Sequence, residues 1–305
     1  MNRLLNVLQT FATPHLIEKL KKTPLVVLLN PETSEVMYIP GATRGNKPYA
    51  WAQKKRMDDV REYIEKNARI DGDRSNTGFW TLTVDHKKYS PLESWEVVKE
   101  ALGDFVRKLK VRFDGEAYIT QREAHLSGHC HVHGLMVMKH QMQGFHDRNG
   151  KLRNREMRVF IRENWKLGRI VDCELAQDAN IASYLTNELG KYAQVENSLR
   201  RADKGTETSR DVKVMLTHYY ADISRSRLFT TSRNLSIKVD EGFDSALLDV
   251  RNNSGVPRVM LVLRYKDLRE ILDREDCFYT DYRAPPGEFE LIMEWLKLKG
   301  RQLST

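Results

Sequence analysis

The sequence predicts an α+β fold with a central antiparallel sheet flanked by helices, and with extra elements at both ends of the chain. Long separations between the predicted strands favour a mixed class over an all-β one. A tight turn between two strongly predicted strands favours antiparallel pairing. The length of 305 residues with 40% hydrophobic side chains allows a sizeable core in one large or two ordinary domains.

The N-terminal third predicts a hairpin, a polar helix, a strand and an amphipathic helix. The hairpin covers 24–38 with its turn at 30–33, the polar helix 50–68 and the strand 79–85. Ser90-Pro91 then opens the amphipathic helix. Its apolar residues recur at helical spacing: Leu92, Trp95, Val98, Leu102, Phe105, Val106 and Leu109.

The middle of the chain predicts two strands, 116–125 and 129–138, around a tight turn at Leu126-Ser127-Gly128. A basic and mostly helical stretch follows over 139–170. The remaining expected elements are a strand at 169–175, a helix from about 179 to 193, strands at 212–220, 227–235 and 257–265, and helices near 266–274 and 287–299.

Composition excludes several classes of protein. No apolar run is long enough to cross a bilayer, and the first 20 residues lack the pattern of a signal peptide, so we expect no membrane partner and a cytoplasmic location in the host cell. Three distant cysteines argue against a disulfide framework and a cysteine-based zinc module. The formal net charge of +8 favours a polyanionic partner.

Positive charge is concentrated in residues 139–170, where nine Lys or Arg face three acidic residues. Such a run can be a solvated helix face or a segment that contacts phosphates. The arginines of interest are Arg153, Arg155, Arg158 and Arg162, with a second cluster at Arg225, Arg227 and Arg233.

The segment from Glu123 to His133 carries the strongest chemical signal. On a strand, His129, His131 and His133 project to the same face. If the hairpin centres on Ser127, Glu123 lies opposite His131, with Cβ atoms about 5 Å apart.

Glu123, His131 and His133 can thus form a three-ligand site with open positions for water and substrate, and its carboxylate suits Mg²⁺ or Mn²⁺. Two alternatives stay open. The histidines can be purely structural, or His129, His131 and His133, with His125, can form a zinc site.

Three motifs appear in a fixed order: Phe79-Trp80-Thr81-Leu82-Thr83, then His131-Val132-His133, then residues 182–187 around Tyr184. In this order they resemble the motifs of the HUH endonucleases, and specifically of rolling-circle replication initiators of plasmids and viruses. Glu123 stands where many members of that family carry a third metal ligand. The resemblance covers roughly residues 75–235.

The resemblance implies that Tyr184 is the nucleophile, on a helix. The chain departs from the family at Asn187, where initiators commonly carry a lysine one turn after the tyrosine. Lys191 lies a further turn along and can take that place, on the same helix face as Tyr184. Tyr192 is a competing nucleophile, or a partner in a two-tyrosine mechanism.

The implied activity is metal-dependent nicking and rejoining of single-stranded DNA at a replication origin, through a covalent 5′-phosphotyrosine. The basic stretch 139–170 and the second arginine cluster are candidates for the DNA path. No phosphate-binding loop of a helicase occurs in the sequence, so a host helicase and polymerase are the expected partners. The corresponding domains are an N-terminal extension (1–70), an endonuclease core (71–238) and a C-terminal extension (239–305).

Two alternatives belong to other functional classes. A non-catalytic DNA-binding protein would need neither the metal nor Tyr184. A zinc hydrolase would tolerate the loss of every tyrosine but not of His131 or His133.

Overall fold

The computed structural model describes residues 8–30, 33–40, 46–168, 171–177, 195–232, 259–264 and 287–298. The chain forms two compact units, one of Met1–Thr13 with Gln53–Ile237 and one of Pro14–Ala52 with Lys238–Thr305. The segment 71–238, predicted as the core, falls almost entirely in the larger unit. Every strand pair among the described residues is antiparallel, and both units also carry helices, so the predicted α+β class is confirmed.

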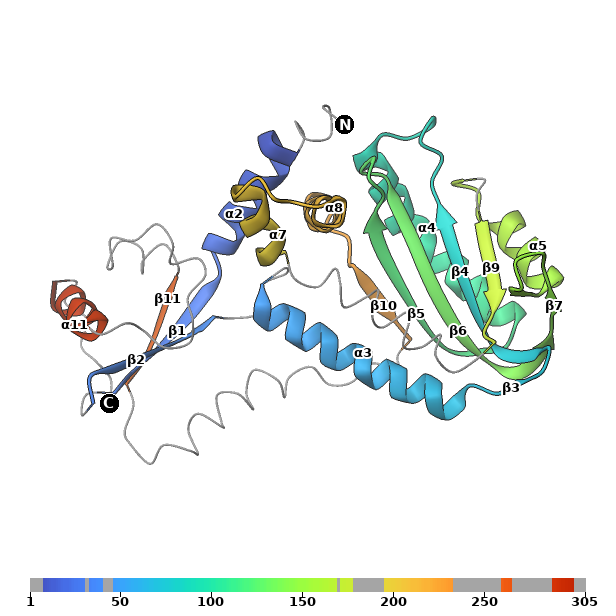
Figure 1. Ribbon diagram of the computed structural model, residues 1–305, viewed down its shortest axis with the longest axis horizontal. Helices are drawn as coiled ribbons and strands as arrows, with labels where there is room; N and C mark the ends of the chain where they lie inside the picture. The colour runs from blue at the N-terminus through green and yellow to red at the C-terminus, as the bar shows by residue number, and fades with distance from the viewer. Residues whose placement is uncertain are drawn as a thin grey trace. The chain divides into compact units, whose positions relative to one another are not determined.

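The larger unit is built on one sheet with the strand order β10-β5-β6-β4-β3, in which β9 also pairs with β4 (Figure 1). The predicted pair around the 126–128 turn is confirmed as β5 and β6, and β6 lies between β5 and β4. The strands are β3 (Ile70–Asp71), β4 (Arg74–Thr83), β5 (Gly115–Ala124), β6 (Cys130–Gln143), β9 (Val171–Leu175) and β10 (Phe229–Thr231).

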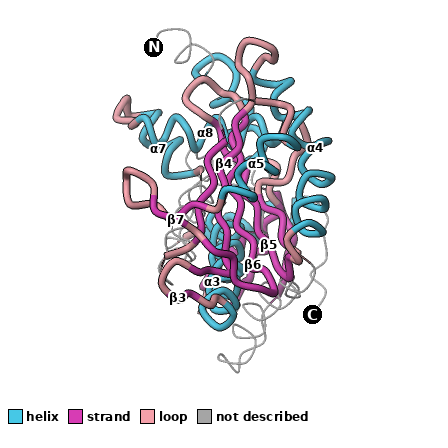
Figure 2. The backbone as a smooth tube through the Cα atoms, turned by 90° about the vertical axis from the view of Figure 1, so that its right-hand side faces the viewer, coloured by secondary structure: helices cyan, strands magenta, loops and turns pink. Residues whose placement is uncertain are grey.

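One face of this sheet is covered by α4 (Pro91–Arg112) and α5 (Arg155–Asn164). A Cβ atom placed on Gly78 of β4 would lie 2.9 Å from Met157 Sδ of α5, so Gly78 faces this helix. Phe105 of α4 meets Trp165, at the end of α5, with ring centroids 5.4 Å apart. The helix α4 runs beside the strands (Figure 2) and contacts both β5 and β6.

The opposite face packs against α3 (Lys47–Asn67). Its residues Val60 and Ile64 form one buried cluster with Phe79, Ile119 and Leu135 of three neighbouring strands. Successive residues of a strand point to opposite faces, so Gly78 faces α5 and its neighbour Phe79 faces α3. The two helices therefore cover opposite faces of the sheet. The helix expected at 50–68 is therefore confirmed.

The helix α4 begins as its sequence predicts. Ser90 caps it, with Glu93 N donating to Ser90 Oγ (3.4 Å) and Ser90 N donating to Glu93 Oε2 (2.7 Å). This reciprocal pair satisfies two backbone donors that the first turn leaves open. Six of the seven predicted apolar residues are buried, whereas Leu92 is 37% exposed in the first turn.

Glycine at position 134 makes room for a tryptophan. A Cβ atom at Gly134 of β6 would lie 2.2 Å from Trp80 Cε2. Trp80 lies opposite Gly134 on β4 and is fully buried. The small residue therefore allows the largest side chain of this face to fit beside the histidine strand.

Two predicted elements of the larger unit are wrong. Residues 212–220, expected as a strand, belong to the helix α8 (Ser209–Ile223), which follows α7 (Glu196–Asp203). Thr208 and Asp211 form a capping box at its start. In the described part of the basic stretch, residues 139–168, only α5 is helical. There β6 continues to Gln143, and a hairpin follows, β7 (Phe145–His146) with β8 (Leu152–Arg153).

The predicted 227–235 strand is confirmed over β10 and the predicted 169–175 strand over β9, while residues 233–235 and 169–170 lie outside the described part of the chain. The helices expected near 179–193 and 266–274 lie outside the described residues.

The second unit has a three-stranded sheet in the order β11-β1-β2. Both the predicted N-terminal hairpin and the predicted strand near 257–265 are confirmed. Tyr38 donates a buried hydrogen bond to Glu288 Oε2 (2.5 Å), which ties β2 to the helix expected at 287–299. The elements are α2 (Thr13–Lys21), β1 (Pro24–Asn30), β2 (Glu35–Pro40), β11 (Val259–Arg264) and α11 (Glu288–Leu298), and the larger unit also holds η1 (Leu8–Ala12).

None of the helices in the described ranges is both long and apolar enough to span a bilayer.

Candidate metal centre

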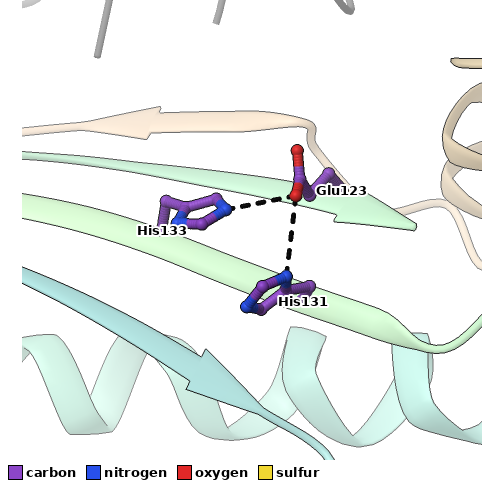
Figure 3. Close-up of side chains that lie close together, drawn as sticks. All are labelled: Glu123, His131 and His133. Carbon is purple, nitrogen blue, oxygen red and sulfur yellow. Dashed lines mark hydrogen bonds and ion pairs between the residues drawn. The ribbon is translucent and has the colours of Figure 1, made fainter. Parts of the chain in front are cut away.

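Glu123 lies near the end of β5, and His131 and His133 lie near the start of β6, on one face of the sheet (Figure 3). Glu123 is the direct register partner of His131, as the turn position predicts. Gly128 adopts a φ of 84° in the connecting turn, a conformation that favours glycine. The turn therefore sets the register that brings the three side chains together.

The three side chains converge on one point. Glu123 Oε1 lies 3.1 Å from His133 Nε2 and 3.5 Å from His131 Nδ1. One ligand atom from each residue can be chosen so that all lie within 4.8 Å of one another. The Glu123 side chain is only 8% exposed, whereas those of His131 and His133 are 20% and 23% exposed. The centre is thus anchored by a buried carboxylate and reached through the imidazoles.

Glu123 is held in its ionised form. Burial acts to raise the pKa of this carboxyl, but hydrogen bonds from His131 and His133 hold the pKa well below its ordinary value. A buried carboxylate beside two imidazoles is a donor set that suits a divalent cation.

A further feature of His131 fits a bound cation. Its Nε2 atom is buried and has no hydrogen-bond partner among the described residues. A buried polar atom without a partner costs free energy. A cation bound through Nε2, or a water molecule on such a cation, would satisfy it, whereas Nδ1 of the same ring faces Glu123. Glu123, His131 and His133 therefore fit a metal ion on both charge and unsatisfied bonding capacity.

The strand of the first motif supports His133. Thr81 Oγ1 lies 3.1 Å from His133 Nδ1, and the two residues are direct register partners across β4 and β6. Phe79 stacks on the same imidazole, with centroids 5.9 Å apart and planes 9° apart. The hydroxyl and the ring together fix the orientation of His133, with Nε2 directed at Glu123. Sequence reasoning missed this contact, although the alternation along 79–83 places Thr81 and Phe79 on one face.

Gln121 is a second residue that sequence reasoning missed. It is 2% exposed and lies directly opposite His133 in the β5–β6 register. It shares a face with Glu123, two residues along the strand. Its Nε2 atom is buried, and no group in the described part of the chain hydrogen-bonds to it. The centre thus contains an amide donor that no described protein group engages.

The predicted shared face does not extend to His129. This residue precedes β6, which begins at Cys130. Its Nε2 lies 2.9 Å from the Tyr89 carbonyl oxygen and its Nδ1 lies 2.8 Å from Ser127 Oγ. Because a carbonyl only accepts, Nε2 carries the proton and donates it. Among the described residues the metal-ligating cluster contains neither His129 nor His125, so the three-histidine zinc site is not formed.

Several predicted site residues fall outside the described part of the chain. Tyr184, Lys191 and Tyr192 lie in 178–194, and Arg233 lies in 233–258. Their roles stay predictions. Arg227 is described and exposed, and its carbonyl oxygen accepts a hydrogen bond from Arg122 Nη1 (2.6 Å).

The four arginines of the basic stretch divide into two groups. Arg155, Arg158 and Arg162 are exposed on α5. Arg153 is a correction to the predicted DNA-binding set, because its side chain is only 9% exposed and forms ion pairs with Asp147 and Asp172. It also donates to the Cys173 carbonyl oxygen (2.7 Å). Its guanidinium therefore joins β8 to β9 and is not available to a phosphate.

No protein-family model matches the chain, and no curated protein or solved structure matches it significantly. The geometry of the centre and the order of the three motifs are therefore the features of the chain that point to a function.

Proposed function

We propose that this protein nicks and rejoins single-stranded DNA at a replication origin, as a metal-dependent rolling-circle initiator of the HUH type. The observation that carries the proposal is the convergence of Glu123, His131 and His133 from two adjacent antiparallel strands. The cluster consists of the two histidines of the His-hydrophobic-His motif and the acidic residue upstream of them.

The surroundings of the cluster support the same proposal. The histidine strand β6 lies inside an antiparallel sheet, next to the strand of the first motif, and helices cover both faces. A nuclease core of the HUH type is expected to have this arrangement. Thr81 of the first motif contacts His133 of the second, which gives the two motifs a physical reason to occur together.

The chemistry is a phosphoryl transfer in which each bond broken is matched by one formed. The tyrosine oxygen, after losing its proton, bonds to the scissile phosphorus, and the bond from phosphorus to the 3′ oxygen breaks. The leaving 3′ oxygen takes up a proton and becomes a hydroxyl. Later attack by that hydroxyl restores the phosphodiester and breaks the bond from phosphorus to the tyrosine oxygen, which takes up a proton, so no nucleotide hydrolysis is needed.

Different residues serve different parts of this reaction. When bound at the centre, a divalent cation supplies charge neutralisation at the scissile phosphate. Glu123 stays ionised because both imidazoles hydrogen-bond to it, and Thr81 and Phe79 orient His133. Tyr184 is the proposed nucleophile, with Lys191 balancing charge, and Tyr192 is the competing nucleophile.

The test is an adduct assay. The full chain is incubated with Mn²⁺ and end-labelled single-stranded DNA from its own replicon, and the products are separated on denaturing gels. We expect a protein–DNA adduct that disappears with a chelator, with Glu123→Gln and with Tyr184→Phe, but persists in Tyr192→Phe.

Each other outcome selects a different function. Loss of the adduct only in Tyr192→Phe would keep the activity and reassign the nucleophile. Metal-dependent cleavage that never yields an adduct would favour a hydrolase. DNA binding without cleavage or adduct, in protein that demonstrably binds Mn²⁺, would favour a non-catalytic DNA-binding protein.

A further inference from the structure

The helix α5 presents three arginines that have no acidic partner among the described residues. Arg155, Arg158 and Arg162 are all exposed, and no described carboxylate forms an ion pair with them. At 100° per residue, the three fall within about 60° of one another around the helix axis. They therefore form one stripe, the α5 arginine stripe, on the outside of the larger unit.

The acidic residues of α5 do not neutralise this stripe. Glu156 pairs with Arg112 at the end of α4. By the same helical spacing, Glu156 and Glu163 lie on a different flank, more than about 80° from the nearest arginine of the stripe. The stripe thus keeps its positive charge, and stripping solvent from a guanidinium without supplying an anion is unfavourable.

The stripe and the metal centre belong to opposite faces of the sheet. Met157 of α5 packs against Gly78 of β4. Thr81, three residues further along the same strand, contacts His133 at the metal centre. Residues separated by an odd number along a strand point to opposite faces. Hence the stripe does not line the metal centre, and a single strand bound to the stripe would have to pass round an edge of the sheet to reach that centre.

The chemistry of the stripe suits a phosphate backbone better than unstacked bases. Proteins that hold single strands combine basic grooves with aromatic side chains on which bases stack. The one aromatic of α5, Phe160, meets Phe113 with ring centroids 5.4 Å apart. The adjoining Trp165 is 2% exposed and donates its indole N–H to the Thr83 carbonyl oxygen (2.8 Å). Trp165 is therefore not free to stack on a base, and Phe160 is only partly exposed.

We infer that the α5 arginine stripe is a second DNA-contacting surface, which binds the phosphate backbone of double-stranded DNA on the face of the sheet opposite the metal centre. Arg155 and Arg162 are about 10 Å apart along the helix axis, about three base-pair steps at 3.4 Å each. About four phosphates of one strand fall within that length, so three guanidiniums spread along it can each reach a phosphate. The inference rests on the proposed function in taking DNA as the polyanion, but the contact itself needs neither the metal nor the nucleophile.

The experiment measures binding without metal. Fluorescence anisotropy of a labelled duplex and of a labelled single strand, both of about 20 nucleotides and mixed sequence, is followed between about 50 and 200 mM salt. The variant is the triple change Arg155→Gln, Arg158→Gln and Arg162→Gln, which keeps good helix formers on an exposed face. A matched control removes three exposed cations elsewhere, Lys87→Gln, Lys204→Gln and Arg210→Gln.

If three phosphate contacts are lost, the slope of log affinity for the duplex against log salt falls by about 2.7. Over the fourfold salt range, wild-type protein then loses about 40 times more affinity than the stripe variant. We expect this effect on the duplex only, and a control variant that follows wild type.

Three results would overturn the inference. Equal losses of duplex affinity in the stripe and control variants would show that the effect comes from total positive charge and not from the stripe. If the stripe variant binds the single strand more weakly and the duplex as well as wild type does, the stripe contacts single-stranded DNA instead. If the stripe variant binds both DNAs as wild type does, the stripe is not a DNA-contacting surface. None of these results bears on the proposed nicking activity. That activity is measured separately in the same variants by the Mn²⁺-dependent adduct assay.

Discussion

Thr81→Val tests whether the first-motif strand tunes the metal centre. Valine keeps the shape and the β-branching of threonine but cannot hydrogen-bond to His133 Nδ1, which now lies 3.1 Å from the hydroxyl. The imidazole would lose the contact that fixes its orientation, while Glu123, His131 and His133 all remain. We therefore expect weaker metal binding in a folded protein.

The size of the effect follows from the surroundings of His133. Removing the hydrogen-bond partner of a metal-ligating histidine typically costs 10- to 100-fold in affinity. Here the side chain is 23% exposed, so water can replace part of the lost bond, and Phe79 still stacks on the ring. The lower end of the range is expected, a loss of about tenfold, or about 1.4 kcal/mol.

The assay is a calorimetric Mn²⁺ titration of wild-type protein, Thr81→Val and Thr81→Ser, with thermal melts to establish folding. Serine restores the hydroxyl and should restore most of the affinity, which a purely steric role would not do. Thr230→Val, on β10 of the same sheet, is the matched control and should bind as wild type does. The reasoning is refuted if valine binds within about twofold of wild type, or if serine is as weak as valine.

Two further predictions concern stability. Gly134→Ala should lower the free energy of unfolding by about 1–3 kcal/mol, because its Cβ would overlap fully buried Trp80. The control Gly103→Ala should not destabilise the protein, because a Cβ at this position of α4 meets no described atom within 4 Å. Urea melts in which Gly103→Ala is the less stable variant would contradict this packing. Arg201, Thr208 and Ser198 overcome the effect of burial and hold the pKa of the Asp211 carboxyl well below its usual value. A lowered native-state pKa stabilises above the unfolded pKa of about 3.9, and this stabilisation is lost as the pH falls through the acid range. The difference in urea midpoint between wild type and Asp211→Asn should therefore be largest near neutral pH and shrink below about pH 4. A difference independent of pH would show that the ionised carboxylate does not cause the stabilisation.

The pairing of Glu123 with His131 could be predicted because a short turn leaves little freedom of register. The same alternation misled at His129, since it holds only inside a strand and β6 begins one residue later. The strand predicted at 212–220 failed for a similar local reason. Its apolar run resembles a strand, but the capping box of Thr208 and Asp211 starts a helix there.

What the sequence could not provide is the order of strands and the face that each helix covers. The contact between Thr81 and His133 requires β4 to lie beside β6, and long-range pairing of that kind leaves no periodic signal. From the sequence, the arginines of α5 could be recognised only as part of a concentration of positive charge. Only the packing of Met157 on Gly78 shows that they belong to the face opposite the metal centre.

The smaller unit has a consequence for the order in which the chain can fold. Its middle strand β1 pairs on one side with β2, next in the chain, and on the other with β11, near the far end. On a ribosome, the whole segment that forms the larger unit is made before Val259–Arg264 emerges. Until then the nascent hairpin exposes an open, apolar edge, which is an aggregation hazard. The topology therefore leaves this edge of β1 unpaired until the last strand of the smaller sheet has been made.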